Sequence, residues 1–573
     1  MIDATSVVHF LQQLLIVVLR ILHCVRTEMP ECGRNQRKVT GMSTFAAPPK
    51  PSGPPTRESA PELPDARVLE DKTPSWFRTT PASALSTFLI GIVFLLMASR
   101  PLWHTDLWDH LNYGQNILAT RTVSVTEPLL RLCRGVSMVN IPWLAQVGMA
   151  SLNDRFGLTA LQFVYALLIA SSLAVIVWRG AKQSHSLIGG LLAAGLFFKV
   201  NLDQLLVIRP QLAGVLFYVI VASWSLGRTK YSKFTWVGMP LMFVLWANLH
   251  GSFSMGLFLM GLTAVGRFGD VLVISRSLKV ALLDRELHRT LLLLQICGMA
   301  VLLNPAGLAI YPEVLNVAGN PNIESMFEWD ALTLRSAQGQ SAAAVALLAF
   351  FAIKLSPRRM HCGEMLSFVV IGLMAAYSAR MLNWWAPIAG LVTGTHLIAG
   401  MRKTATWLKR RQPAKPSGLW TLVQAGLFWI LFAMTPFGIQ VLHGRVPDPH
   451  RLVSAETPLA TVSYLDSMES IPRGICFIPA EWSGYVMNRG PKSLEPMVNL
   501  HVHVIPAQVW NDYIRMINGP SDWQSLMDEY GINLAIVDRN RQPGLHKSFK
   551  GSADWKAMYE DRQAAVFVRR NPI

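Results

Sequence analysis

Apolar segments of membrane-spanning length dominate this chain and set the class of fold that it can adopt. Between residues 81 and 442 there are roughly eleven such segments, and a membrane-spanning helix needs about 20 apolar residues. They cover residues 81–99, 156–178, 186–198, 210–227, 235–248, 252–274, 290–303, 342–355, 365–379, 384–400 and 418–442. Only 15% of the 573 residues are charged, against about 25% in soluble chains. The sequence therefore predicts a mainly α, polytopic α-helical membrane protein.

The positive charge of the chain follows the pattern of membrane topology. The formal net charge is +17, and Lys and Arg gather in every second loop between the apolar segments. Cytoplasmic loops collect Lys and Arg, so the alternation predicts a protein of the cell membrane with a cytoplasmic N-terminus and an external C-terminus. Clustering in short loops also argues against a nucleic-acid partner, which would favour a basic stripe or face.

Three parts of different composition follow from this topology. A run rich in Pro, Ser and Ala at residues 46–64 indicates disorder, and residues 1–80 are predicted to be a disordered cytoplasmic tail in which Met42 is a second candidate start. Residues 81–442 form the predicted membrane domain, with a long first outside loop at 100–155. Residues 443–573 alternate helical patterns with strand-like stretches, which predicts a small extracytoplasmic α/β domain.

The first outside loop carries the residues that best fit catalysis. On a helix, Asp106, Asp109 and His110 would share one face, because they stand three and four positions apart. Nearby aromatic residues such as Trp108 and Tyr113 would rest at the bilayer interface, at the level of a lipid headgroup. A carboxylate there can take a proton from an attacking hydroxyl. The alternative is an interfacial helix whose charged side chains are solvated or cap its first turn.

Cations at the outer ends of the apolar segments fit a site for the phosphate of a lipid-linked donor. Arg209, His250 and Arg380 all fall on the predicted outer side, where polar groups near the bilayer are costly unless they face protein or water. Arginine is suited to bidentate contact with phosphate. The alternative for each arginine is an interfacial side chain whose charged head reaches water.

Four further residues on the predicted outer side are candidates for binding the acceptor or for a structural role. Trp143 and Gln146 lie on a second helical stretch of the first loop, and Glu328 and Trp329 lie in a later, acidic loop. That loop leaves a divalent cation possible, although solvated carboxylates are the simpler explanation. The sequence therefore assigns no metal ligand and no certain cofactor.

A pair of histidines in the last domain is a weaker candidate. His501 and His503 on a strand predicted at 497–505 would point to one face. Paired imidazoles can bind a transition metal, but no third ligand stands at a fixed spacing.

An ordered set of short motifs gives the chain a family resemblance. The motifs are Asp106-Leu107-Trp108-Asp109-His110 with Tyr113-Gly114, Trp143-Leu144-Ala145-Gln146, Arg209-Pro210-Gln211, Asn248-Leu249-His250-Gly251, Asn304-Pro305-Ala306-Gly307 and Glu328-Trp329. In this order they resemble bacterial multi-span proteins with the architecture of the GT-C class of polytopic glycosyltransferases. The resemblance runs from about Leu102 to Ile573. It implies transfer of a sugar from a polyprenyl-phosphate carrier on the outer face, with an aspartate of the first loop as general base.

The sequence and the resemblance are compatible with two functions. One is an inverting glycosyltransferase that passes the sugar to an envelope acceptor. In it Asp106, or secondarily Asp109, is the base, His110 orients the acceptor, and the three outer cations hold the donor phosphate. The other is a non-catalytic membrane scaffold, or a subunit that translocates lipid or polysaccharide. Ionisable residues cluster at segment ends rather than at mid-bilayer, which weighs against transport. Both functions imply contact with membrane lipid, and neither fixes the oligomeric state.

Overall fold

The computed structural model describes residues 70–103, 105–227, 231–402, 414–518 and 522–573. Residues 71–573 form one compact unit. Most of the predicted tail, including Met42, lies outside the described residues. Its last part, 70–80, holds a short 3-10 turn, and Thr79 forms a β-bridge with Ser417.

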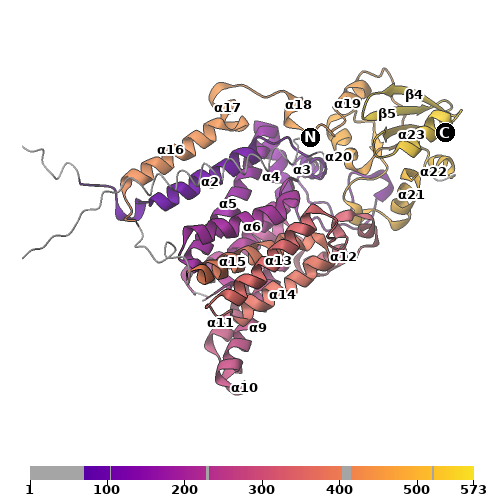
Figure 1. Cartoon of the computed structure of the whole chain (residues 1–573). Helices are drawn as coiled ribbons and strands as arrows, with labels where there is room; N and C mark the ends of the chain where they lie inside the picture. The colour runs from indigo at the N-terminus through magenta and orange to yellow at the C-terminus, as the bar shows by residue number, and fades with distance from the viewer. Residues whose placement is uncertain (1–69, 104, 228–230, 403–413, 519–521) are drawn as a thin grey trace, which may run out of the picture. The chain divides into compact units, whose positions relative to one another are not determined.

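A helix covers each apolar segment that the sequence predicts (Figure 1). In chain order these are α2 (Pro81–Ala98), α5 (Leu158–Ser184), α6 (Leu187–Leu205), α7 (Gln211–Ser225), α8 (Met239–Leu249), α9 (Phe253–Ser275), α11 (Arg285–Val301), α13 (Ala337–Leu355), α14 (Cys362–Tyr377), α15 (Leu382–Met401) and α16 (Gly418–Met434). The last segment continues as α17 (Pro436–His443) after a bend of 86°. The bend falls at Pro436, whose ring and missing N–H prevent α16 from running on.

Four of these helices, α2, α5, α9 and α13, are long and apolar enough to cross a membrane within the described part of the chain. The bent pair α16 and α17 would make a fifth, and three shorter apolar helical segments cover 211–225, 235–249 and 362–377. The mainly α, polytopic membrane fold is confirmed. The number of spans stays a prediction.

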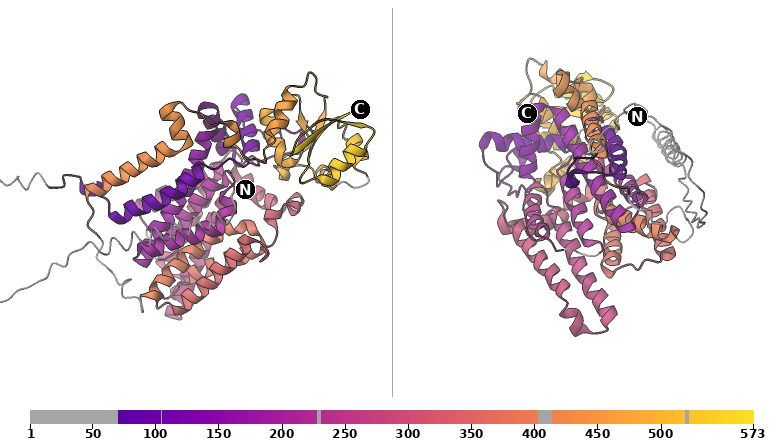
Figure 2. Two further views of the ribbon diagram at one scale, coloured as in Figure 1. Left: turned by 45° about the horizontal axis from the view of Figure 1, so that its top comes forward. Right: turned by 90° about the vertical axis from the view of Figure 1, so that its left-hand side faces the viewer.

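Helix α15 lies in the core of the bundle, and nearly every residue along it is buried. It packs on α6, α13 and α14. A side chain at Gly390 would collide with the backbone carbonyl of Ala193 on α6, so the two helices can approach only because the residue is glycine. Figure 2 shows the long helices side by side, with the sheet at one end.

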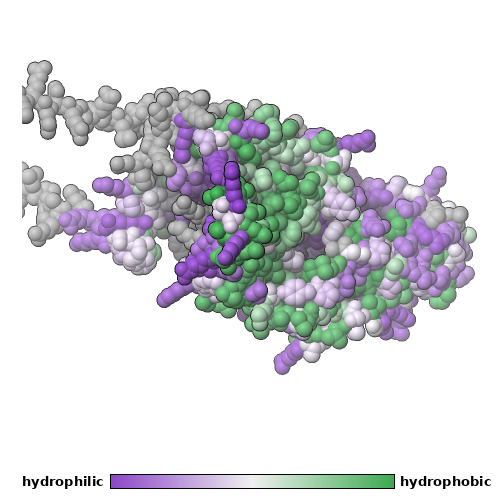
Figure 3. All heavy atoms as spheres, turned by 90° about the horizontal axis from the view of Figure 1, so that it is seen from below, coloured by the Kyte–Doolittle hydropathy of each residue, from purple (hydrophilic) through white to green (hydrophobic). Residues whose placement is uncertain are grey.

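The surface of the bundle is apolar between two polar ends. Exposed large hydrophobic side chains include Leu241 on α8, Leu373 on α14 and Trp429 on α16. Figure 3 shows hydrophobic side chains over the bundle, with hydrophilic side chains over the C-terminal sheet and its helices. This distribution is what a bundle set in lipid requires.

Helices α3 (Leu107–Thr120) and α4 (Trp143–Phe156) form a layer against the end of the bundle where the C-terminal region attaches. They cross at Gly114, where any side chain would collide with the carbonyl of Gln146. The prediction that Trp108 and Tyr113 face the bilayer interface is wrong. Trp108 and Tyr113 are each 1% exposed, because protein rather than lipid covers them.

The C-terminal region contains a five-stranded mixed sheet in the order β2-β1-β3-β5-β4. Its strands are β1 (Ile475–Phe477), β2 (Glu495–Pro496), β3 (Leu534–Asp538), β4 (Trp555–Glu560) and β5 (Ala564–Arg569). Strands β2, β1 and β3 are parallel, whereas β3, β5 and β4 are antiparallel. Its helices are α18 (Pro449–Leu452), α19 (Leu459–Asp466), α20 (Ala480–Arg489), α21 (Ala507–Ile517), α22 (Trp523–Glu529) and α23 (Pro543–Gly551).

The predicted strand at 497–505 is wrong. This stretch contains a 3-10 turn, η10 (Val502–Val504), and the side chain of Asn499 accepts a hydrogen bond from the backbone N–H of His501 at 3.0 Å. Such a local bond favours a turn over a strand. Strand β4 was not predicted, because most of its residues are exposed at the sheet edge and show no clean alternation.

Short elements complete the described chain. They are α10 (Leu278–Leu282), α12 (Ile310–Ala318), the 3-10 turns η2 (Ser75–Phe77), η3 (Arg131–Cys133), η5 (Gly307–Ala309), η6 (Pro321–Ser325), η7 (Phe327–Trp329) and η8 (Ala379–Met381), and the π-turn η4 (Phe234–Gly238).

Candidate active site

Four charged side chains from distant parts of the chain form one connected group, which we call the outer cluster. Arg209 pairs with Asp106 and with Glu328, the latter through Nη1 at 2.7 Å. Arg380 donates from Nη1 to the other oxygen of Glu328, also at 2.7 Å. The contacts therefore run Asp106, Arg209, Glu328, Arg380, with the candidate base at one end and an arginine at the other.

Breaks between helices position these four side chains. Asp106 directly precedes α3, and its carboxylate does not cap that helix. Arg209 lies between α6 and α7, where Pro210 favours a new helix start. Glu328 and Arg380 sit in the 3-10 turns η7 and η8, and these turns are joined because the N–H of Ala379 donates to the carbonyl of Asp330 at 3.0 Å.

The outer cluster is balanced in charge and partly buried. Two arginines and two carboxylates sum to zero formal charge, and the four side chains are between 15% and 24% exposed. Burial raises the pKa of Glu328, but Arg380 and Arg209 outweigh it, so the pKa lies below its ordinary value. Arg380 also lies over the ring of Trp329, 4.8 Å from its centre, which fixes the guanidinium by a cation–π contact.

His110 is held beside this cluster as a neutral donor. Oε1 of Gln146 accepts a hydrogen bond from Asn140 at 2.6 Å, which turns the amide nitrogen of Gln146 toward Nδ1 of His110 at 3.4 Å. Burial lowers the pKa of His110 to about 4, and the charge of Arg209 contributes to the shift. With Nδ1 accepting, the remaining proton sits on Nε2.

His250 is neutral for a similar reason. The backbone N–H of Ser252 donates to Nδ1 of His250 at 3.0 Å, so Nε2 carries the proton. Burial lowers the pKa of His250 to about 3, and the charge of Arg380 contributes. His250 therefore joins the outer cluster as a hydrogen-bond donor and not as a third positive charge.

Three of the sequence motifs meet next to His250, those that contain Trp143, Asn248 and Asn304. Asn248 accepts a hydrogen bond from the indole of Trp143 at 2.9 Å and donates to the carbonyl of Leu303 at 2.9 Å. Asn304 donates to the carbonyl of Ala247 at 2.9 Å. Trp143 is thus a packing residue of the wall that carries His250, and it links the first loop to the later motifs.

Asp109 is separated from the outer cluster by its burial. It is 1% exposed, and one of its oxygens accepts a hydrogen bond from the N–H of Leu500 at 3.2 Å. A side chain at Gly484 on α20 would collide with the other oxygen. Burial raises the pKa of Asp109 to about 8, and the charge of Asp106 contributes. Asp109 is therefore buried where α3 meets α20, which argues against its predicted role as a second base.

The C-terminal region contributes residues that were not predicted to belong to this site. The ring of His501 stacks on Tyr113 with 4.3 Å between centres and lies 5.3 Å from His110. Burial lowers the pKa of His503 to about 4, and the charge of Arg380 contributes, which places His503 near the arginine end. Tyr113 donates to Glu127 at 2.6 Å. The His-x-His spacing was the only signal for this contribution, and it indicated a metal rather than the site.

The possible divalent cation finds no support in these contacts. No group of three or more His, Cys, Asp or Glu side chains is placed to hold a metal among the residues that the structure describes. Both oxygens of Glu328 and one of Asp106 already face arginines.

Comparison of the sequence with models of known families and with curated proteins finds no match. Solved structures do match. The oligosaccharyltransferase of Archaeoglobus fulgidus in its apo form has a TM-score of 0.50 and 10% identity over 81% of this chain and 70% of that chain. ArnT from Cupriavidus metallidurans bound to undecaprenyl phosphate has a TM-score of 0.47 and 12% identity, over 85% and 97%. The mycobacterial arabinofuranosyltransferase AftD has a TM-score of 0.48 and 13% identity, over 86% and 40%. The chain has the GT-C-like fold that the sequence motifs predict.

Proposed function

We propose that this protein transfers a sugar from a polyprenyl-phosphate carrier to an acceptor at the outer face of the cell membrane, and that the outer cluster is its active site. The observation that carries the proposal is the chain of contacts from Asp106 through Arg209 and Glu328 to Arg380. It joins a candidate general base to two guanidinium groups at the end of a membrane bundle. The likeness of fold to the archaeal oligosaccharyltransferase supports the same class.

The donor phosphate binds at the arginine end. Arg380 is oriented by Glu328 and Trp329, and a planar guanidinium suits the oxygens of a phosphodiester. The neutral rings of His250 and His503 add hydrogen-bond donors without adding charge. Glu328 keeps both arginines in place before the donor arrives.

Proton transfer then redistributes charge within the outer cluster. The acceptor oxygen attacks the anomeric carbon, the bond from that carbon to the phosphate oxygen breaks, and Asp106 takes the acceptor proton. The phosphodiester, with one negative charge, becomes a phosphomonoester with two. Once protonated, Asp106 no longer neutralises Arg209, so the cluster gains one net positive charge as the leaving phosphate gains one negative charge.

The acceptor approaches from the side of His110. Its Nε2–H is available because Gln146 holds Nδ1, and it lies next to Asp106 on the first turn of α3. His110 therefore orients the acceptor hydroxyl toward Asp106, and Gln146 is a positioning residue.

Sugar transfer by the purified full chain in liposomes, supplied with a panel of polyprenyl-phosphate sugars, tests the proposal. Asp106→Asn is expected to lower turnover by about 100-fold or more, because the amide cannot accept the proton. Asp154→Asn is the matched control: Asp154 is exposed on α4, where its nearest partner is Gln115 at 3.5 Å. It should leave turnover unchanged.

Two results would contradict the proposal. Turnover that is insensitive to Asp106→Asn would remove the base. No turnover from any donor would favour the non-catalytic scaffold or the translocation subunit, and in that case the outer cluster would serve only to join the first loop to the bundle.

A further inference from the structure

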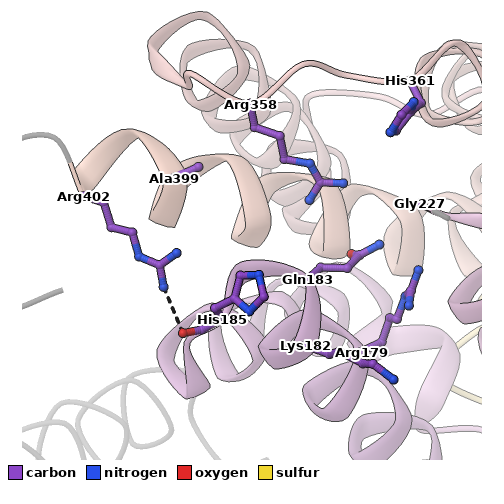
Figure 4. Close-up of a pocket in the computed structure, with 9 residues that line it drawn as sticks. All are labelled: Arg179, Lys182, Gln183, His185, Gly227, Arg358, His361, Ala399 and Arg402. Atoms are coloured by element: carbon purple, nitrogen blue, oxygen red, sulfur yellow. Dashed lines mark hydrogen bonds between the residues drawn. The ribbon is translucent and has the colours of Figure 1, made fainter. Parts of the chain in front are cut away.

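A second charged site lies at the opposite end of the bundle. Helix α5 has 27 residues, which span about 40 Å, and a cavity of about 500 Å³ lies at its C-terminal end, whereas the first-loop layer packs near its start. We call it the inner cavity. Its lining comes from the ends of α5, α7 and α15 and from the loop between α13 and α14, and Figure 4 shows these side chains: Arg179, Lys182, Gln183, His185, Gly227, Arg358, His361, Ala399 and Arg402.

Positive charge in the inner cavity is not fully matched by carboxylates. Arg358 pairs with Glu364 at 2.8 Å, and His361 lies 3.3 Å from Asp270. In the described part of the chain, no carboxylate pairs with Arg179 or Lys182. This differs from the outer cluster, where each cation has an anion.

The local packing keeps Arg179 available to the cavity. One Nη of Arg179 donates to the carbonyl of Leu226, and Gln183 donates to the same oxygen at 2.7 Å. Nε of Arg179 is buried and has no hydrogen-bond partner among the described residues. Gly227 stands opposite with φ of +100°, and a side chain there would come within 2.9 Å of the guanidinium. Glycine therefore keeps space in front of Arg179.

One lining residue of the inner cavity, Lys182, lies beside an exposed tryptophan. Lys182 is exposed and lies over the ring of Trp178, 4.9 Å from its centre, and Trp178 is itself 57% exposed. An exposed tryptophan beside a lysine at the end of a membrane helix is typical of the headgroup level of a bilayer. Basic pockets between membrane helices at that level bind lipid phosphates.

We propose that the inner cavity binds a phosphate group carried by an anionic membrane lipid. Arg179 and Lys182 contact the phosphate, Arg358 adds to the positive field, and the acyl chains lie along the apolar surface beside Trp178. The site is independent of the proposed sugar transfer, since α15, whose 20 residues span about 30 Å, begins just after Arg380 of the outer cluster and ends at the cavity. A free phosphate compound offers the same chemistry without the acyl chains.

Lipid retention by the purified full chain tests this proposal by native mass spectrometry. The probes are phosphatidylglycerol, phosphatidylcholine and, as the soluble source, glycerol 3-phosphate. The wild-type chain should retain phosphatidylglycerol over phosphatidylcholine. Lys182→Gln and Arg179→Gln should each weaken retention roughly fivefold and together roughly 25-fold. Lys279→Gln, an exposed cation on α10 outside the cavity, should change nothing.

The results distinguish a lipid phosphate from a soluble phosphate compound, and both from non-specific retention of lipid. Displacement of phosphatidylglycerol by glycerol 3-phosphate would support a phosphate site but overturn the lipid as its source. Equal retention of the two lipids, or equal weakening by Lys279→Gln and Lys182→Gln, would overturn the site. Lys182 is exposed, so its substitution tests the proposal even if Arg179→Gln disturbs folding.

Discussion

The outer cluster and the inner cavity use the same kind of side chain in opposite ways. In the outer cluster two arginines face two carboxylates, and the formal charge is zero. In the inner cavity Arg179 and Lys182 have no carboxylate partner among the described residues. A balanced group can shift charge when one proton moves, whereas an unmatched group attracts an anion permanently. The difference indicates chemistry at one end of the bundle and binding at the other.

Removing the central cation of the outer cluster should have the largest effect. Arg209→Gln leaves Asp106 without its cation and Glu328 with only Arg380, so we expect a loss of about 2 to 3 kcal/mol of unfolding free energy. Unfolding in detergent measures it. Asp106→Asn in the same chain should restore part of the loss, because the unpaired charge is gone. If the double variant is less stable than Arg209→Gln, the two side chains do not act as a pair.

Removing Arg380, the arginine at the end of the outer cluster, should affect donor binding more than stability. Arg380→Gln leaves Glu328 paired with Arg209, and we expect KM for the lipid donor to rise about tenfold with a smaller change in kcat. Arg335→Gln changes an exposed arginine in the same connection between α12 and α13 as Glu328 and is the control. A tenfold change in kcat with KM unchanged would contradict a role in holding the phosphate.

The pH dependence of stability should follow Asp109. Its pKa is about 8 in the folded chain and near 4 when unfolded, so the folded state holds the extra proton between these values. The contribution of Asp109 to stability is therefore full below about pH 4 and falls as the pH rises to about 8. Asp109→Asn should flatten this slope and raise the melting temperature at pH 8 by about 2 °C or more. An unchanged slope would show that Asp109 is not the group responsible.

The smallest expected effect is that of a substitution in the inner cavity on sugar transfer. Lys182→Gln should change sugar transfer by less than about twofold, because the length of α15, about 30 Å, separates the cavity from the outer cluster. A loss as large as that of Arg380→Gln would show that the two ends are coupled, and the contrast between them would fail.

The sequence predicts the bundle well because apolar length is a local property. Each of the segments between residues 81 and 442 became a helix, and Pro436 marks the break in the last one. The strand at 497–505 failed because Asn499 closes a local turn, and the edge strand β4 shows little alternation. Burial by a distant part of the chain was not predictable from the first loop, which is why Asp109 and Trp108 were placed at a surface.

The sequence predicts the residues of the candidate site, but not the contacts that they make with distant parts of the chain. Asp106, Arg209, Glu328 and Arg380 were all singled out from the sequence, and the structure brings them into contact. The paired residues are between 52 and 119 positions apart, and no local pattern predicts such pairing. The neutral state of His110 depends on Gln146 and on burial, and a sequence shows neither.

Binding of the product, a polyprenyl phosphate, to the wild-type chain and to Asp106→Asn tests the central claim most directly. The amide imitates the protonated carboxyl, so Arg209 is left free to face the phosphate. We expect Asp106→Asn to bind the product about tenfold more tightly while losing turnover. Equal or weaker binding by Asp106→Asn would contradict the transfer of charge from Asp106 to the leaving phosphate.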